Sequence, residues 1–278
     1  MNAAPIGPGS LTWHHFGDSR GLLFLGRIGT LQNMHPAVGA ALQDHSDFFD
    51  NPLDRLFRSM PPILGVVYDP PGSGTGALVR SFHTDLKGVD SKGRRYHALH
   101  PDVFWWTHVT FVEGIMAVNE FFGTPLTRAE KDRLVAEGVT WWRRYGLTDR
   151  PVIDNYADFE AYWRRMLDEE LEANATTDYA LAMSGIRIPP PPFVPAAVWA
   201  VVRRPVMRFG SWLSIGLLPP RAREILGATW SARDQRRFRA VAAVVRWVWP
   251  RLPRRLRYLD RAHANMRLVD SGRWWAAV

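Results

Sequence analysis

Hydrophobic positions along this chain recur mostly at intervals of three and four, the spacing that places apolar side chains on one face of an α-helix. Alternating apolar and polar runs, which are typical of strands, are scarce. The exception is a small hairpin expected near residues 88–99, where Asp90-Ser91-Lys92-Gly93 has the composition of a tight turn. The pattern therefore predicts an all-α fold with one main multi-helix domain.

Proline and capping signals set the expected helix limits. Pro61 and Pro62 are expected to interrupt a helix that opens at 51–52, and a further helix is expected over about 75–87. A long aromatic helix is expected from Pro101 to about 122. The Thr127-Arg128-Ala129-Glu130 segment has the form of a capping box, which predicts the next helix, to about 145. Further helices are expected over about 157–172 and from 231 to about 249.

Four consecutive prolines at 189–192 mark the clearest boundary in the chain. We therefore expect a helical core over 1–188, a Pro-rich connector over 189–195 and an Arg-rich helical part over 196–278 that packs on the core. The apolar run over 195–218 is broken by arginines and a proline, so no stretch reaches the ~20 apolar residues of a membrane span.

Charge is distributed unevenly between these parts. The chain has a net charge of +8, yet residues 201–278 alone hold 17 Arg, no Lys and 4 acidic residues. Because these arginines alternate with Trp, Phe, Val and Leu, the composition favours an anionic membrane surface over nucleic acid as the partner. Ordinary solvated helix faces explain the same arginines equally well. The start, MNAAPIGPGSLTW, has no export signal, which favours a cytoplasmic location, at most peripheral to the inner face of the membrane.

Candidate chemistry begins with a polar patch formed by Arg80, His83 and Thr84. If the predicted helix continues to about 87, spacings of three and four place these three side chains on one face. A guanidinium, an imidazole and a hydroxyl could then converge on one ligand.

His108 is the second candidate, because its own helix face carries apolar and aromatic residues. A neutral imidazole there needs a hydrogen-bond partner or a metal, and a hydrogen-bonded core histidine is the commoner case. The chain has no cysteine, which excludes thiolate ligation of haem, cysteine-held iron–sulfur clusters and disulfides. Glu113 lies in the same helix, so His83, His108 and Glu113 form a weak candidate for a non-haem iron site.

Two segments carry a resemblance to a known family: Arg80-Ser81-Phe82-His83-Thr84 and Trp106-Thr107-His108. They resemble the catalytic domain of rubber oxygenase (latex-clearing protein) and of the endoplasmic-reticulum-bound oxygenase of mycophenolic acid biosynthesis. The early segments 7–10, 31–36 and 45–48 are similar to uncharacterised bacterial members. The resemblance extends over roughly residues 7 to 260.

This resemblance implies an all-helical fold of the rubber-oxygenase type and a b-type haem with iron. It implies that His108 is the axial metal ligand and that Arg80 and Thr84 lie beside the porphyrin. A guanidinium is suited to a haem propionate, because it can donate two parallel hydrogen bonds. His83 stands where rubber oxygenase can place a distal lysine, and it joins Arg80 and Thr84 as a candidate catalytic residue. The glutamate proposed as a base upstream of the arginine has no counterpart in residues 61–70, where Asp69 is the only acid.

The expected function is a haem b-dependent oxygenase or peroxidase-like oxidoreductase acting on an apolar, isoprenoid or lipid-like small molecule; its electron donor is not identified. Two alternatives remain open. One is a non-catalytic lipid-binding helical protein that keeps His108 as a core residue, and the other is a non-haem iron oxygenase.

Overall fold

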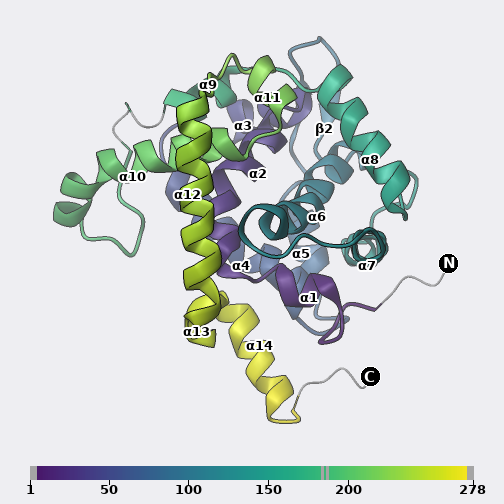
Figure 1. Cartoon of the computed structure of the whole chain (residues 1–278). Helices are drawn as coiled ribbons and strands as arrows, with labels where there is room; N and C mark the ends of the chain where they lie inside the picture. The colour runs from purple at the N-terminus through teal and green to yellow at the C-terminus, as the bar shows by residue number, and fades with distance from the viewer. Residues whose placement is uncertain (1–4, 183–184, 186–187, 274–278) are drawn as a thin grey trace.

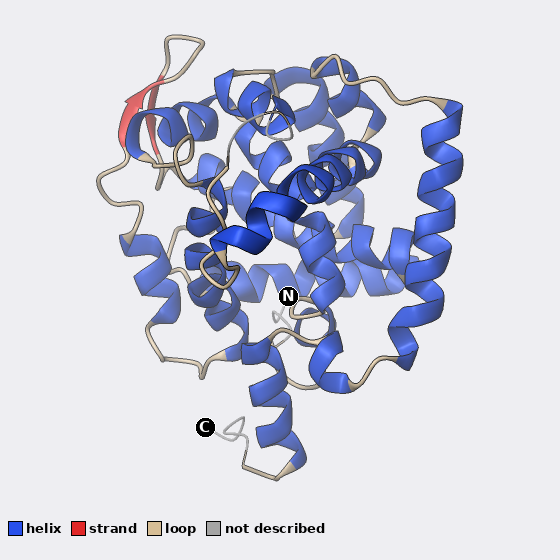
Figure 2. Cartoon of the chain, turned by 90° about the vertical axis from the view of Figure 1, so that its left-hand side faces the viewer, coloured by secondary structure: helices blue, strands red, loops and turns tan. Residues whose placement is uncertain are grey.

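Helix-start signals in the sequence fall where the helices of the computed structural model begin. Thr127 and Ser231 each accept a hydrogen bond from a main-chain N–H three residues on, and Glu130 and Asp234 reach back to complete two capping boxes. The structure describes residues 5–182, 185 and 188–273. Residues 1–4, 183–184 and 186–187 of the predicted core and residues 274–278 of the predicted Arg-rich part lie outside these ranges. Within the described ranges the fold is all-α with one small hairpin, as predicted (Figures 1 and 2).

In chain order the elements are α1 (Leu11–His15), η1 (Ser19–Phe24), α2 (Leu25–Asn33), α3 (Pro36–His45), α4 (Pro52–Tyr68), α5 (Thr75–Ser81), β1 (Lys87–Val89), β2 (Arg95–His97), α6 (Pro101–Phe122), α7 (Arg128–Arg143), α8 (Tyr156–Arg165), η2 (Met166–Glu170), α9 (Ala175–Ala182), α10 (Ala196–Leu217), α11 (Pro220–Ile225), α12 (Ala232–Val248), η3 (Trp249–Arg251), α13 (Arg254–Arg257) and α14 (Asp260–Asp270).

The long helix α6 is the centre of the fold. It packs against η1, α2, α7 and α12, and fourteen of its residues are buried, among them Trp105, Trp106 and His108. Antiparallel β1 and β2 pair Gly88 with Tyr96, which confirms the predicted hairpin. The expected helix over 157–172 forms as α8 followed by the π-helical turn η2.

An ion pair with a buried arginine joins three helices of the fold. Arg27 of α2 donates to both carboxylate oxygens of Glu113 in α6, at 2.5 and 2.7 Å, and its Nε donates to the Leu217 carbonyl of α10 at 2.9 Å. The Arg27 side chain is 3% exposed, so its charge depends on these partners.

The Arg-rich C-terminal part shares apolar contacts with the rest of the chain. Leu213, Leu217 and Phe238 form one buried cluster with Phe24 and Phe122. At the end of the described chain, Ala262 and Met266 of α14 are buried in the main core, against α4.

Two expected helix limits are wrong. Pro61 and Pro62 do not interrupt α4, because its second half, residues 64–68, is buried in the core and tertiary packing outweighs the lost hydrogen bonds. The helix expected over 75–87 ends at Ser81. Its last carbonyls are taken by side chains instead: His83 Nδ1 bonds the Val79 carbonyl, and the Thr84 hydroxyl donates to the Ser81 carbonyl.

Candidate functional site

The polar patch is held close to the end of α7 by α5. Gly76 of α5 makes this approach possible, because a Cβ there would overlap the main-chain carbonyl of Arg144. Arg80, one turn later, donates from Nη1 to the carbonyls of Tyr145 at 3.1 Å and Gly146 at 2.7 Å. Gly146 has a φ of +69°, a left-handed conformation that ends the helix and favours glycine.

The three members of the patch do not share one helix face, contrary to the prediction, because His83 and Thr84 lie in the turn after α5. The Thr84 side chain is exposed and bonded to its own turn, whereas His83 is turned inward. The His83 ring meets the ring of Phe104 edge-on, with centroids 5.2 Å apart. Burial lowers the pKa of His83, and its bond to the Val79 carbonyl partly offsets this, so the imidazole is neutral at pH 7.

His108 lies inside an aromatic box formed by the rings of Trp105, Trp141, Trp142 and Tyr145. The ring centroids are 5.0 to 5.8 Å from that of His108, whose exposed fraction is only 1%. His108 Nε2 donates to the Gly138 carbonyl of α7 at 2.9 Å. Burial lowers the pKa of His108 to about 4, so the imidazole is neutral at pH 7.

Three polar atoms in this region are buried without a hydrogen-bond partner among the described residues: His108 Nδ1, Trp105 Nε1 and Trp141 Nε1. The rings of Trp105 and Trp141 lie 5.4 and 5.0 Å from that of His108. A buried polar atom left unpaired costs about 1–3 kcal/mol, so three in one place are unusual. His108 therefore has a second ring nitrogen that makes no hydrogen bond inside the described ranges.

Two aromatic side chains connect the polar patch to His108. The Phe104 ring contacts both His83 and Tyr145, the latter at 5.1 Å, and the Tyr145 ring contacts His108 at 5.8 Å. The Tyr145 carbonyl also accepts from Arg80. The structure thus gathers Arg80, His83 and His108 around Phe104 and Tyr145, and leaves Thr84 at the edge.

Tyr145, Trp141 and Trp142 are the rings around His108 that the sequence analysis missed. The Tyr145 ring is 2% exposed, and burial raises the pKa of its hydroxyl well above the usual range. A signal was present in Trp141-Trp142-Arg143-Arg144-Tyr145, where Trp141 and Tyr145 are four apart at the end of the predicted helix. In the structure Trp141 lies in the last turn of α7 and Tyr145 in the turn that follows it.

The candidate non-haem iron site does not form. Glu113 is ion-paired with Arg27, and it lies five residues after His108 on α6, roughly 140° around the helix. Across the described part of the chain, no group of three or more His, Cys, Asp or Glu side chains comes together as a metal site.

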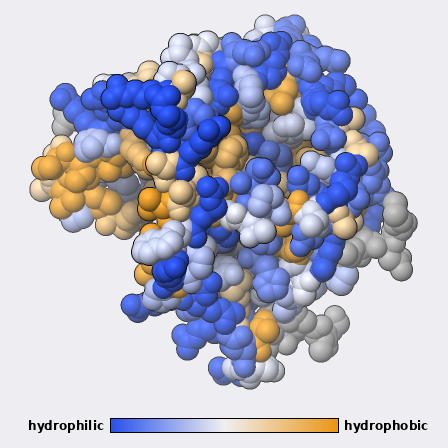
Figure 3. Space-filling model, viewed as in Figure 1, coloured by the Kyte–Doolittle hydropathy of each residue, from blue (hydrophilic) through white to orange (hydrophobic). Residues whose placement is uncertain are grey.

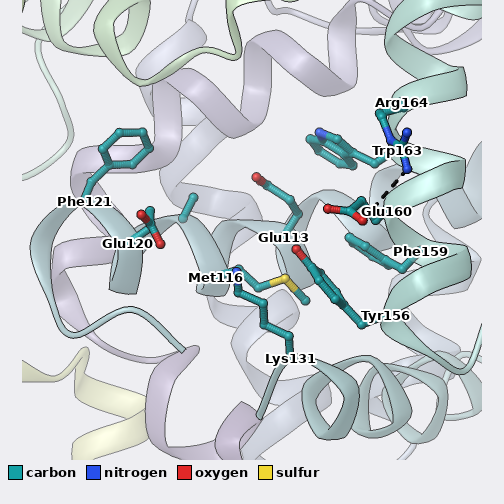
Figure 4. Close-up of a pocket in the computed structure, with 11 residues that line it drawn as sticks. Glu113, Met116, Glu120, Phe121, Lys131, Tyr156, Phe159, Glu160, Trp163 and Arg164 are labelled. Carbon is teal, nitrogen blue, oxygen red and sulfur yellow. Dashed lines mark ion pairs between the residues drawn. The ribbon is translucent and has the colours of Figure 1, made fainter. Parts of the chain in front are cut away.

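Glu113 instead belongs to an open cleft of about 460 Å³ between α6, α7 and α8 (Figure 4). One wall carries Glu113 and Met116, and the other carries Tyr156, Phe159 and Trp163, with Phe159 and Trp163 stacked. Because Glu113 and His108 point to different sides of α6, this cleft does not adjoin the His108 ring.

Two buried neutral histidines, His108 and His35, make the stability of the fold dependent on pH. The pKa values of His108 and His35 are lowered to about 4 by burial, whereas an unfolded histidine has a pKa near 6.5. Between about pH 6.5 and pH 4 the unfolded chain binds protons at these histidines that the folded chain does not. The free energy of unfolding therefore decreases as the pH is lowered from about 6.5 to about 4. Above about pH 6.5 these two groups do not change it. In urea titrations at several pH values, His108→Leu should weaken the dependence of the free energy of unfolding on pH. The same dependence in the variant and the wild type would contradict this prediction.

Residues 13–247 match the family model described as ER-bound oxygenase mpaB/B'/Rubber oxygenase, catalytic domain. No curated protein and no solved structure shows a significant match to the chain.

Proposed function

Because the chain belongs to the family of MpaB and rubber oxygenase catalytic domains, we propose that it is a haem b-dependent oxygenase or peroxidase-like oxidoreductase acting on an apolar, isoprenoid or lipid-like small molecule. The family match supports a general oxygenase role. The observation that carries the cofactor proposal is His108, a fully buried neutral imidazole that keeps Nδ1 without a partner among the described residues.

The donor chemistry around His108 fits haem b. An imidazole must be neutral to hold haem iron, and burial keeps His108 in that form, so His108 would be the residue that holds it. Arg80 donates to the carbonyl of Tyr145, and the Tyr145 ring contacts His108. The Arg80 guanidinium is suited to pair with a propionate. The aromatic box already lies against His108, so binding at this residue must replace some of these ring contacts. When bound, haem supplies an iron centre that can activate dioxygen or peroxide.

The remaining residues have roles that follow from their own bonds. His83 Nδ1 donates a hydrogen bond to the Val79 carbonyl, which fixes the ring. Its Nε2 makes no hydrogen bond inside the described ranges. As a neutral imidazole it can hold or pass one proton at that atom. Phe104 and Tyr145 are buried and exclude water between His83 and His108. Thr84 remains a candidate for hydrogen bonding at the edge of the patch.

We further propose that the protein acts at the cytoplasmic face of a membrane, where an apolar substrate dissolves. The support is the excess of 17 Arg over 4 acidic residues in 201–278. In the ranges that the structure describes, no helix has the length and apolar character needed to cross a bilayer.

The proposal is tested by measuring haem and iron in the protein purified after expression with a haem precursor. A pyridine haemochrome assay should find close to one haem b per chain. Iron without haem would favour a non-haem oxygenase, and a folded protein with neither, even after haem is added, would favour a lipid-binding protein that keeps the family scaffold.

A further inference from the structure

The most prominent exposed apolar surface of the described chain lies on α10. The last turns of this helix are packed in the fold through Leu213 and Leu217, whereas the part before them projects from the side of the molecule (Figure 1). Apolar atoms gather over the same projecting region in Figure 3. The exposed residues form an apolar arc: Val198, Val201, Pro205, Val206 and Phe209.

The arc occupies one side of the helix. At 100° per residue its five members fall within about 140° of the helix circumference. Val201 is 77% exposed and Phe209 is 47% exposed, values at which large apolar side chains remain in contact with water. The side of α10 beyond Val206 is different, since Trp199 and Met207 are buried there. The arc is therefore a surface that the described part of the fold leaves uncovered.

Arginines border the arc on one flank. Arg204 and Arg208, four residues apart, are both exposed there. An apolar face of this width with a cationic margin is typical of a helix that lies in the plane of a membrane interface, because the arginines reach lipid phosphates while the apolar side chains enter the acyl boundary. A water-soluble protein partner would require no such row of like charge.

We infer that the exposed segment of α10, residues 198–209, is the membrane-docking element of this protein and that its occupant is the surface of an anionic phospholipid bilayer. The excess positive charge of the following residues, 17 Arg against 4 acidic residues in 201–278, complements such a surface over a longer range. This inference rests on the membrane-surface part of the proposed function and is independent of the cofactor. It assigns the contact to one helix instead of the whole Arg-rich part.

The test is sedimentation of the full chain with vesicles of phosphatidylcholine, with and without about 30% phosphatidylglycerol. The double variant Val201→Ser/Phe209→Ser should lower partitioning about tenfold or more. The matched control is Val244→Ser/Trp247→Ser on α12, whose side chains are 60% and 63% exposed; it removes comparable apolar area from another Arg-rich helix and should bind like the wild type. Arg204→Gln/Arg208→Gln should remove most of the preference for phosphatidylglycerol, as should about 0.5 M salt.

Three results would overturn the inference. Equal binding by the α10 variant and the wild type would contradict this assignment alone. A wild type that does not sediment with the vesicles would contradict the membrane proposal as a whole. A wild type that is dimeric in gel filtration, and monomeric after Val201→Ser/Phe209→Ser, would show that a second copy covers the arc. Melting temperatures of all variants check that folding is retained.

Discussion

Haem b titrated into the purified protein should give a Soret band in the wild type, and His108→Ala should abolish or strongly weaken it. The physical reason is that His108 is the histidine enclosed by the aromatic box, with Nδ1 unpaired among the described residues. Because Trp105, Trp141 and Trp142 surround it, haem binding at His108 should also quench tryptophan fluorescence. His100→Ala, at an exposed histidine next to the same helix, is the matched control and should keep the wild-type spectrum.

A second variant separates ligation from folding. His108→Gly with added imidazole should recover part of the Soret band, because free imidazole can occupy the space of the missing ring and ligate the iron. An unfolded variant would show no such recovery. A Soret band that is identical in the wild type and in His108→Ala would rule out His108 as the iron ligand. His83 would then be the next candidate for that role. Arg80→Met should weaken haem binding to a smaller extent, since it removes only the cationic partner.

Arg27→Met should lower the free energy of unfolding by about 3 kcal/mol, the lower end of the cost of removing one partner of a buried ion pair, because the Glu113 side chain is 17% exposed. The substitution leaves the Glu113 carboxylate without its two hydrogen bonds and the Leu217 carbonyl without its donor. Urea denaturation followed by circular dichroism measures the effect. Arg58→Met is the matched control: Arg58 pairs with Asp47 and Asp54 at the surface and should cost at most about 1 kcal/mol.

The reverse outcome is informative too. If Arg27→Met were as stable as Arg58→Met, the Glu113 carboxylate would be accommodated by water in the neighbouring cleft, and the ion pair would not be a main link between α2 and α6.

The sequence predicted the fold class well because its strongest signals are local. The capping box at Thr127 and Pro101 at the first turn of α6 need no tertiary information. The prediction failed where tertiary contacts decide. α4 continues through Pro61 and Pro62 because its second half is buried, and α5 stops at Ser81 because His83 turns inward against Phe104, which lies on another helix.

The candidate site was predictable in its members more than in its arrangement. Spacing singled out Arg80, His83 and Thr84, and an apolar helix face singled out His108. The structure gathers Arg80, His83 and His108 around two aromatic rings and leaves Thr84 at the edge. Periodicity within one segment cannot show that Tyr145, 37 positions after His108, supplies one of those rings and the carbonyl for Arg80. That contact depends on how α7 crosses α5 and α6.

The last helix, α14, sets the limits of the folding unit. The family match ends at residue 247, yet Ala262 and Met266 belong to the same buried cluster as Trp13 and Tyr68, and Arg261 is ion-paired with Asp69. A Cβ on Gly17 would overlap Ala262, so the first and last segments of the fold are in direct contact. A shortened chain that stops at the family boundary would therefore expose apolar core at the opposite end of the sequence, and expression of the catalytic region should extend at least through α14.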